Sequence, residues 1–150
     1  MSTKAKIKYL DTAELPRLFN AIRSDKTKHR IRNEAMFRLA EYCALRISEI
    51  GLIDMRDYNP ITHQIYCRRL KNSNDNTLKI LDIEVIESLE NYLLIRDLYY
   101  PKASEIGTTA LFVSQQGNPV TPKLLDKIMR NYASIAKLPA DKHHFHVLKH

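Results

Sequence analysis

Residues 64–81 read Gln-Ile-Tyr-Cys-Arg-Arg-Leu-Lys-Asn-Ser-Asn-Asp-Asn-Thr-Leu-Lys-Ile-Leu, and their hydrophobic pattern differs from that of the rest of the chain. Ile65 and Cys67 recur with a period of two, in a run rich in strand-forming residues. The polar residues 72–76 predict a turn, and residues 77–81 predict a returning strand. The stretch therefore predicts an antiparallel β-hairpin.

The segments on both sides of the hairpin predict helices, because their apolar residues recur every three or four positions. We expect helices at about 11–22, 31–43, 48–53, 84–97 and 121–136, and from about 145 onwards. A short third strand is expected at 111–113, followed by a turn at 116–119. The fold class is thus α+β and mainly α, with helices packed around a small antiparallel sheet in one domain.

Local signals define several helix boundaries. Asp11 or Thr12 is expected to cap the first helix, with Glu14 reaching back to the N–H of the cap. Ser48 is expected to cap the short third helix. Thr121-Pro122 predicts a helix that begins with proline. On the 84–97 helix the pattern places five apolar side chains toward the core: Val85, Ile86, Leu89, Leu93 and Leu94.

Composition narrows the class of protein. A chain of 150 residues is long enough for one buried core. Two cysteines without a CxxC pair exclude a disulfide-stapled scaffold and a cysteine-ligated zinc module. No apolar run is long enough for a membrane span or a signal peptide. We therefore expect a soluble cytoplasmic protein that does not associate with membranes.

The net charge of +7 is unevenly distributed. Residues 1–38 carry ten basic and four acidic side chains, and residues 121–150 carry six and two. Residues 81–106 carry two basic and six acidic side chains. Clustered Lys and Arg are typical of proteins that neutralise the phosphates of nucleic acids. Solvated helix faces that happen to be basic would give the same pattern.

Three features of the sequence are candidates for catalytic or ligand-binding residues. Arg46 lies where one helix should end and another begin, and its guanidinium could bind a phosphate or pair with Glu49. Lys71 lies at the hairpin turn, where it is either a ligand contact or a solubilising lysine. Residues 143–150 contain four histidines. Histidines four residues apart can hold a metal ion, but no HExxH glutamate accompanies them, and we expect no metal site.

Taken in order, these motifs resemble those of the tyrosine recombinases, the phage integrase family. Ala-Leu-Arg-Ile-Ser-Glu-Ile at 44–50 is similar to the first arginine box, and Arg-Arg-Leu-Lys-Asn at 68–72 to the hairpin lysine motif. Leu-Phe-Val at 111–113, followed by Gly-Asn-Pro-Val at 117–120, resembles the stretch before the penultimate helix. His-Val-Leu-Lys-His at 146–150 looks like the second box. The likeness is greatest to the short recombinases of fimbrial switches.

The resemblance implies the catalytic domain of a DNA breaking-rejoining enzyme that binds duplex DNA. A tyrosine would attack the scissile phosphate and form a 3′-phosphotyrosyl intermediate, with no metal and no small-molecule cofactor. Arg46 would stabilise charge on the phosphate, and Lys71 would protonate the leaving 5′-oxygen. His146 would act as a general base or phosphate donor, and Lys149 would take the place of the second arginine. Glu49 would hold the site in position.

The same resemblance implies further contacts with DNA and an assembly on it. We expect Arg68 and Arg69 at the hairpin, and Lys123 and Lys127 on the helix after Pro122, to bind DNA. The complete protein is expected to form a homotetramer on DNA.

Two departures from the family pattern affect these expectations. Lysine at position 149 keeps the charge of arginine but loses the bidentate phosphate contact. All eight tyrosines precede the second box, and none matches the position of the nucleophile. We therefore expect that the chain lacks the C-terminal segment with the third box and the tyrosine, and that it binds DNA without cleaving it. A DNA-binding module without catalysis and an enzyme like type IB topoisomerases remain alternatives.

Overall fold

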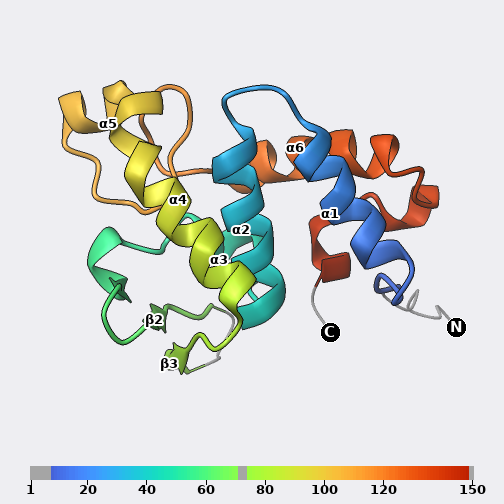
Figure 1. The fold of residues 1–150 in the computed structure, drawn as a ribbon, viewed down its shortest axis with the longest axis horizontal. Helices are drawn as coiled ribbons and strands as arrows, with labels where there is room; N and C mark the ends of the chain where they lie inside the picture. The colour runs from blue at the N-terminus through green and yellow to red at the C-terminus, as the bar shows by residue number, and fades with distance from the viewer. Residues whose placement is uncertain (1–7, 71–73, 149–150) are drawn as a thin grey trace, which may run out of the picture.

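The computed structural model describes residues 8–70 and 74–148, and Figure 1 shows their arrangement. The α-helices are α1 (Glu14–Ser24), α2 (Arg30–Cys43), α3 (Ile47–Ile50), α4 (Ile83–Tyr99), α5 (Pro101–Ile106) and α6 (Pro122–Ile135). The strands are β1 (Tyr58–Asn59), β2 (Gln64–Cys67) and β3 (Asn76–Lys79). Three short 3₁₀ helices are η1 (Met55–Asp57), η2 (Ala140–Lys142) and η3 (Phe145–Leu148).

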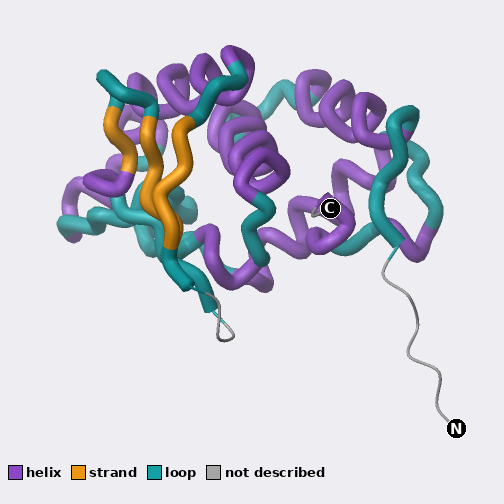
Figure 2. Tube along the Cα trace, turned by 90° about the horizontal axis from the view of Figure 1, so that it is seen from below, coloured by secondary structure: helices purple, strands orange, loops and turns teal. Residues whose placement is uncertain are grey.

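The three strands form one antiparallel sheet in the order β1-β2-β3. Gln64 pairs with Lys79 and Cys67 pairs with Asn76, so β2 and β3 are the two arms of the predicted hairpin. Ile65 and Cys67 are fully buried, as the period of two predicts. Figure 2 shows the strands side by side at one end of the molecule, next to the helices.

Helix α2 lies at the centre of the fold, between α4 on one side and α1 on the other (Figure 1). Its Phe37 ring meets the rings of Tyr132 on α6 and Phe145 on η3 edge to face, at centroid distances of 5.8 and 5.3 Å. Edge-to-face pairs are a favourable geometry for buried aromatic rings. The prediction of a mainly helical fold with a small antiparallel sheet is confirmed.

Two predicted helix starts are also confirmed. Asp11 Oδ1 accepts the N–H of Glu14 at 2.8 Å, and Glu14 Oε1 accepts the N–H of Asp11 at 3.0 Å. These reciprocal bonds satisfy donors that the first turn of a helix leaves unpaired. Pro122 is the first residue of α6, and the Thr121 hydroxyl accepts the N–H of Leu124.

The predicted strand at 111–113 is wrong. The third strand of the sheet is β1, while Val113 forms only an isolated bridge with Pro119. Residues 111–113 are completely buried, and the Leu111 carbonyl accepts hydrogen bonds from the side chains of Tyr92 and Arg96 on α4. The segment is thus a buried connection in which side chains provide part of the hydrogen bonding to the backbone.

Two helical details also differ from the prediction. Ser48 lies inside α3, because Arg46 is the residue that precedes the first turn. Leu94 is 81% exposed, although we expected it to face the core. The buried face of α4 continues through Tyr92 and Arg96, so Leu94 points to the opposite side.

In the part of the chain that the structure describes, no helix is long and apolar enough to cross a membrane.

Candidate active site

Arg46 lies in a tight junction between α2 and α3. Ala44 adopts a left-handed conformation (φ 52°) and ends α2. Arg46 is extended (φ −76°, ψ 154°) and precedes α3, where the side chain of Glu49 accepts its N–H at 2.8 Å. The chain thus turns sharply at the arginine, as the sequence predicts.

Glu49 connects this junction to the hairpin. Its side chain is 1% exposed, and its Oε2 atom accepts the N–H of Leu70 at 2.9 Å. Burial alone would raise the pKa of this carboxyl, but the N–H groups of Arg46 and Leu70 and the charges of Arg69 and Arg46 together lower it. Glu49 is therefore a buried, ionised carboxylate that joins three segments.

The Arg46 side chain extends to the same point. Its Nη1 atom donates to the Leu70 carbonyl at 2.7 Å and lies 3.6 Å from Glu49 Oε2. The side chain is 29% exposed, so an anion at the surface can approach it. Lys71 follows directly in the sequence but lies outside the described residues, as does Lys149.

His146 lies on η3, at a cavity of about 370 Å³. The cavity is lined by Ile47, Pro122, Lys123, Asp126, His144, Phe145 and His146. The residue next to Arg46 and the predicted His146 thus line one cavity. Partial burial and the nearby His144 lower the pKa of His146, while Asp126 acts in the opposite direction. A neutral imidazole at neutral pH can accept a proton or a hydrogen bond.

The four residues expected to bind DNA have different surroundings. Lys123 lines the cavity of His146, whereas Lys127 lines a different one. Arg68 pairs with Asp57, and its side chain is 33% exposed. Arg69 is directed inward, with a side chain 13% exposed. Their DNA contacts stay predictions.

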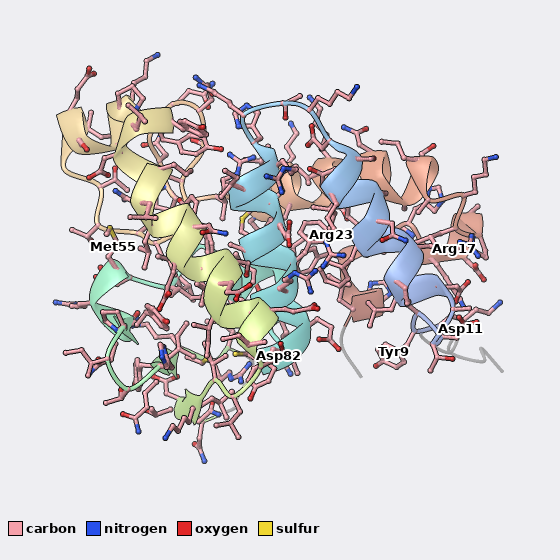
Figure 3. The ribbon with its side chains drawn as sticks, viewed as in Figure 1. Tyr9, Asp11, Arg17, Arg23, Met55 and Asp82 are labelled. Carbon is pink, nitrogen blue, oxygen red and sulfur yellow. The ribbon has the colours of Figure 1, made fainter. Side chains whose placement is uncertain are left out.

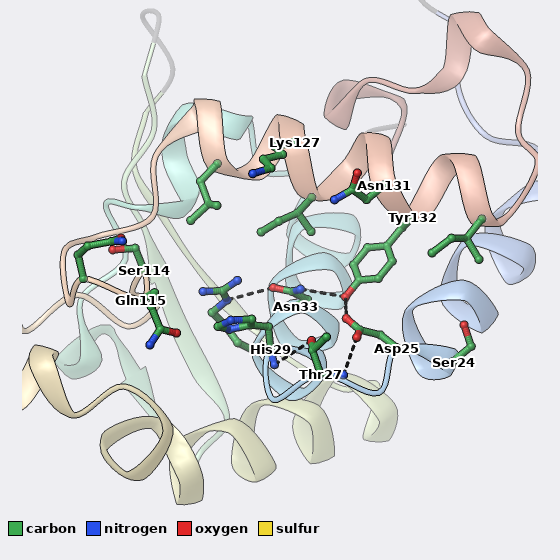
Figure 4. A pocket seen from close by; sticks show the side chains of 15 residues that line it. Ser24, Asp25, Thr27, His29, Asn33, Ser114, Gln115, Lys127, Asn131 and Tyr132 are labelled. Atoms are coloured by element: carbon green, nitrogen blue, oxygen red, sulfur yellow. Dashed lines mark hydrogen bonds between the residues drawn. The ribbon is translucent and has the colours of Figure 1, made fainter.

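The cavity that Lys127 lines has a volume of about 500 Å³ and lies between α6, the α1–α2 loop and residues 114–116 (Figure 4). Its polar groups pair with one another: the Asn33 amide donates to the Tyr132 hydroxyl at 2.9 Å, and that hydroxyl donates to Asp25. Arg46, Glu49 and His146 do not line it.

Sequence reasoning missed the inward role of Arg69. Its partners include the carbonyls of Cys43 and Ala44, which precede it by about 25 residues. No local pattern signals such a contact, and a pair of adjacent arginines is equally typical of a basic surface.

Comparison with known proteins identifies the family of the chain. The family model described as "Phage integrase family" matches residues 8–150. The chain belongs to the phage integrase family. The resemblance predicted from the motifs is confirmed.

Among curated relatives, this phage integrase domain is 34% identical over 114 residues to the type 1 fimbriae regulatory protein FimB of Escherichia coli (strain K12). The match covers 76% of the chain and 50% of FimB. The chain thus spans about half the length of this relative.

Solved structures show the same fold. The XerA recombinase superposes with a TM-score of 0.74 at 20% identity, over 99% of this chain and 48% of XerA. The XerH recombinase bound to its difH substrate gives a TM-score of 0.74 at 21% identity, over 99% of this chain and 43% of XerH. These superpositions show that the chain has the fold of a tyrosine recombinase catalytic domain.

Proposed function

We propose that the complete gene product is a site-specific DNA recombinase and that residues 1–150 belong to its catalytic domain. A tyrosine beyond His150 attacks a scissile phosphate, forms a 3′-phosphotyrosyl ester and releases a 5′-hydroxyl. The 5′-hydroxyl of a second strand then attacks that ester and frees the tyrosine. Each step exchanges one phosphate ester for another, so the reaction needs no nucleotide or other energy-rich cofactor.

One observation supports this proposal most strongly. Arg46 and Glu49 contact Leu70, which directly precedes Lys71, although 24 residues separate Arg46 from Leu70. The cavity beside Ile47 contains His146. Cationic and imidazole groups from separate segments can then act on one phosphate, whose charge they stabilise.

Each group has a role in this reaction. Arg46 donates to the non-bridging oxygens of the phosphate as charge develops on them. Lys71 gives a proton to the leaving 5′-oxygen. His146, neutral at neutral pH, acts as a general base or hydrogen-bond partner, and Lys149 adds a second positive charge. Glu49 does not touch the phosphate; it holds Arg46 and the hairpin in place.

The partner in this proposal is duplex DNA. Recombination between two duplexes requires the cleavage of four strands, which is consistent with four protomers on DNA. We assign contacts with DNA phosphates to Arg68, Lys123 and Lys127. Lys123 and Lys127 are exposed on α6, and the Arg68 side chain is 33% exposed. We expect this reaction to take place on DNA in the cytoplasm.

The test is covalent capture. The complete gene product is first used to select its target from random duplexes. A duplex with that target and a nick next to the scissile phosphate loses the 5′-hydroxyl fragment after cleavage, so the phosphotyrosyl ester accumulates. We expect a complex that resists detergent, and none with residues 1–150 alone.

Other outcomes contradict the proposal. Specific binding without any covalent complex would indicate a DNA-binding module without catalysis. Relaxation of supercoiled plasmids that lack the target would indicate an enzyme like type IB topoisomerases.

A further inference from the structure

All three nitrogens of the Arg69 guanidinium donate hydrogen bonds within the protein. Nε donates to Asn76 Oδ1 at 2.9 Å, and Nη2 donates to the Cys43 carbonyl at 2.9 Å. Nη1 donates to the Ala44 carbonyl at 3.3 Å and to Glu49 Oε1 at 3.4 Å. One side chain therefore connects β3, the end of α2 and the buried carboxylate of the site.

The end of α2 provides a physical reason for this arrangement. The last carbonyls of a helix have no partner within the helix and carry partial negative charge. The carbonyls of Cys43 and Ala44 lie at this end, and both accept from Arg69. Arg69 thus caps, from a distant segment, the helix that leads into Arg46.

The backbone around Arg69 is fixed as well. Its N–H donates to Asp75 Oδ1 at 2.7 Å, and the other oxygen of Asp75 accepts the Tyr66 hydroxyl at 2.7 Å. The next residue, Leu70, gives its N–H to Glu49 and its carbonyl to Arg46. The position of the Arg69 backbone thus determines where Arg46 finds its acceptor.

Within the described part of the chain, two cations compete for Glu49. Arg69 Nη1 lies 3.4 Å from its Oε1 atom, and Arg46 Nη1 lies 3.6 Å from its Oε2 atom. A carboxylate that is 1% exposed needs compensating charge, because its desolvation is costly. If Arg69 were removed, Arg46 would be the remaining positively charged partner of Glu49 among residues 8–70 and 74–148, and it would be drawn toward Glu49.

We propose that Arg69 is a positioning residue, which satisfies Glu49 and the end of α2 so that the Arg46 guanidinium stays directed at the phosphate. This inference rests on the proposed function and replaces the expected contact of Arg69 with DNA. Arg69 affects the reaction only through Arg46 and contributes nothing to the affinity for DNA.

The experiment uses the complete gene product and the nicked duplex described above. Arg69→Met removes the donors and keeps most of the length of the side chain, and Arg69→Lys keeps the charge. Arg17→Met is the matched control, because Arg17 on α1 (labelled in Figure 3) caps the end of α6 through the carbonyls of Ala136 and Lys137. Thermal unfolding verifies that each variant is folded.

Two measurements separate positioning from DNA contact. We expect Arg69→Met to keep the wild-type Kd for the duplex and its salt dependence, and to form the covalent complex roughly 10- to 100-fold more slowly. The rate of covalent complex formation should fall less in Arg69→Lys than in Arg69→Met, and Arg17→Met should keep the wild-type rate. A weaker Kd with a salt slope reduced by about one would indicate a phosphate contact and overturn the inference.

A substrate with a neutral scissile group tests whether Arg46 is the group that Arg69→Met displaces. A methylphosphonate at the scissile position is neutral, so its transition state carries one negative charge fewer for Arg46 to stabilise. On this substrate the deficits of Arg46→Ala and Arg69→Met should both shrink relative to the wild type. An Arg69→Met deficit that stays unchanged would overturn the inference. If Arg69→Met does not fold, the same comparison is made with Arg69→Lys. Failure of the wild type on both substrates would instead overturn the proposed function, and this inference with it.

Discussion

The Nη1 atom of Arg46 lies 2.7 Å from the carbonyl oxygen of Leu70, in a hydrogen bond that spans 24 residues of sequence. This contact joins the α2–α3 junction to the end of the hairpin arm that leads to Lys71. Glu49 reinforces it by accepting the N–H groups of both residues. The position of one predicted catalytic residue therefore depends on the segment that contains another.

Replacement of Arg46 should separate binding from chemistry. In the complete gene product we expect Arg46→Ala to slow covalent complex formation by about 10²-fold or more, with most of the affinity for DNA retained. Arg46→Lys should recover part of this loss, because lysine keeps the charge but not the fork of donors. Single-turnover assays and binding titrations measure both effects. Arg56→Ala, at an arginine side chain that is 81% exposed on η1, is the control and should keep the wild-type rate.

Glu49 should be important for stability. Glu49→Ala leaves two half-buried N–H groups without their acceptor and removes the carboxylate that pairs with Arg69, and should reduce the free energy of unfolding by about 2–4 kcal/mol. Glu49→Gln keeps one acceptor oxygen, so its loss in the free energy of unfolding should be smaller. Urea denaturation of residues 1–150 provides the measurement. Equal stability of Glu49→Ala and the wild type would contradict the role of this carboxylate.

His29 should make the fold sensitive to mild acid. Burial and the charges of Arg32 and Lys28 lower its pKa from the ordinary value of 6.5, although Asp25 opposes them. The unfolded chain then binds more protons than the folded one below about pH 6.5. This contribution to stability is complete above that pH and decreases as the pH falls toward the lowered value. His29→Gln should therefore flatten the pH dependence of urea denaturation between pH 7 and 5, and an unaltered slope would disprove the assignment.

Gly117 should tolerate no side chain. Its φ is +86°, and a Cβ atom there would lie 2.6 Å from the backbone of Lys102 and Ala103. Gly117→Ala should cost about 2 kcal/mol or more, since strain and overlap add. Gly107→Ala is a close control, because Gly107 has a φ of +73° and open space around it. It should cost only about 1 kcal/mol. Equal losses of stability would show that the contact at Gly117 is unimportant.

Much of the fold could be predicted because its signals are local. The period of two at Ile65 and Cys67 gave the hairpin, and Thr121-Pro122 gave the start of α6. The prediction of a strand at 111–113 was wrong because a short apolar run has the same composition in a strand as in a buried connection. The prediction that Leu94 faces the core was wrong because α4 has apolar residues around most of its circumference. Tertiary packing therefore determines which side of α4 is buried.

The site could be predicted only in part. The position of Arg46 at a junction of two helices follows from the helical periodicity on both sides of it. The contacts of Arg69 do not, because they depend on how the hairpin docks on the end of α2. A basic dipeptide on a surface hairpin and one that caps a distant helix have the same local sequence.

We propose that Arg46, Lys71 and His146 meet at one phosphate of DNA. A structure of the complete gene product on its selected duplex, with vanadate in place of the scissile phosphate, tests it most directly. We predict that the guanidinium, the ammonium and the imidazole all lie within hydrogen-bond distance of the vanadate oxygens. A vanadate bound by other side chains, with these three groups on separate surfaces, would show that the three residues do not form one active site.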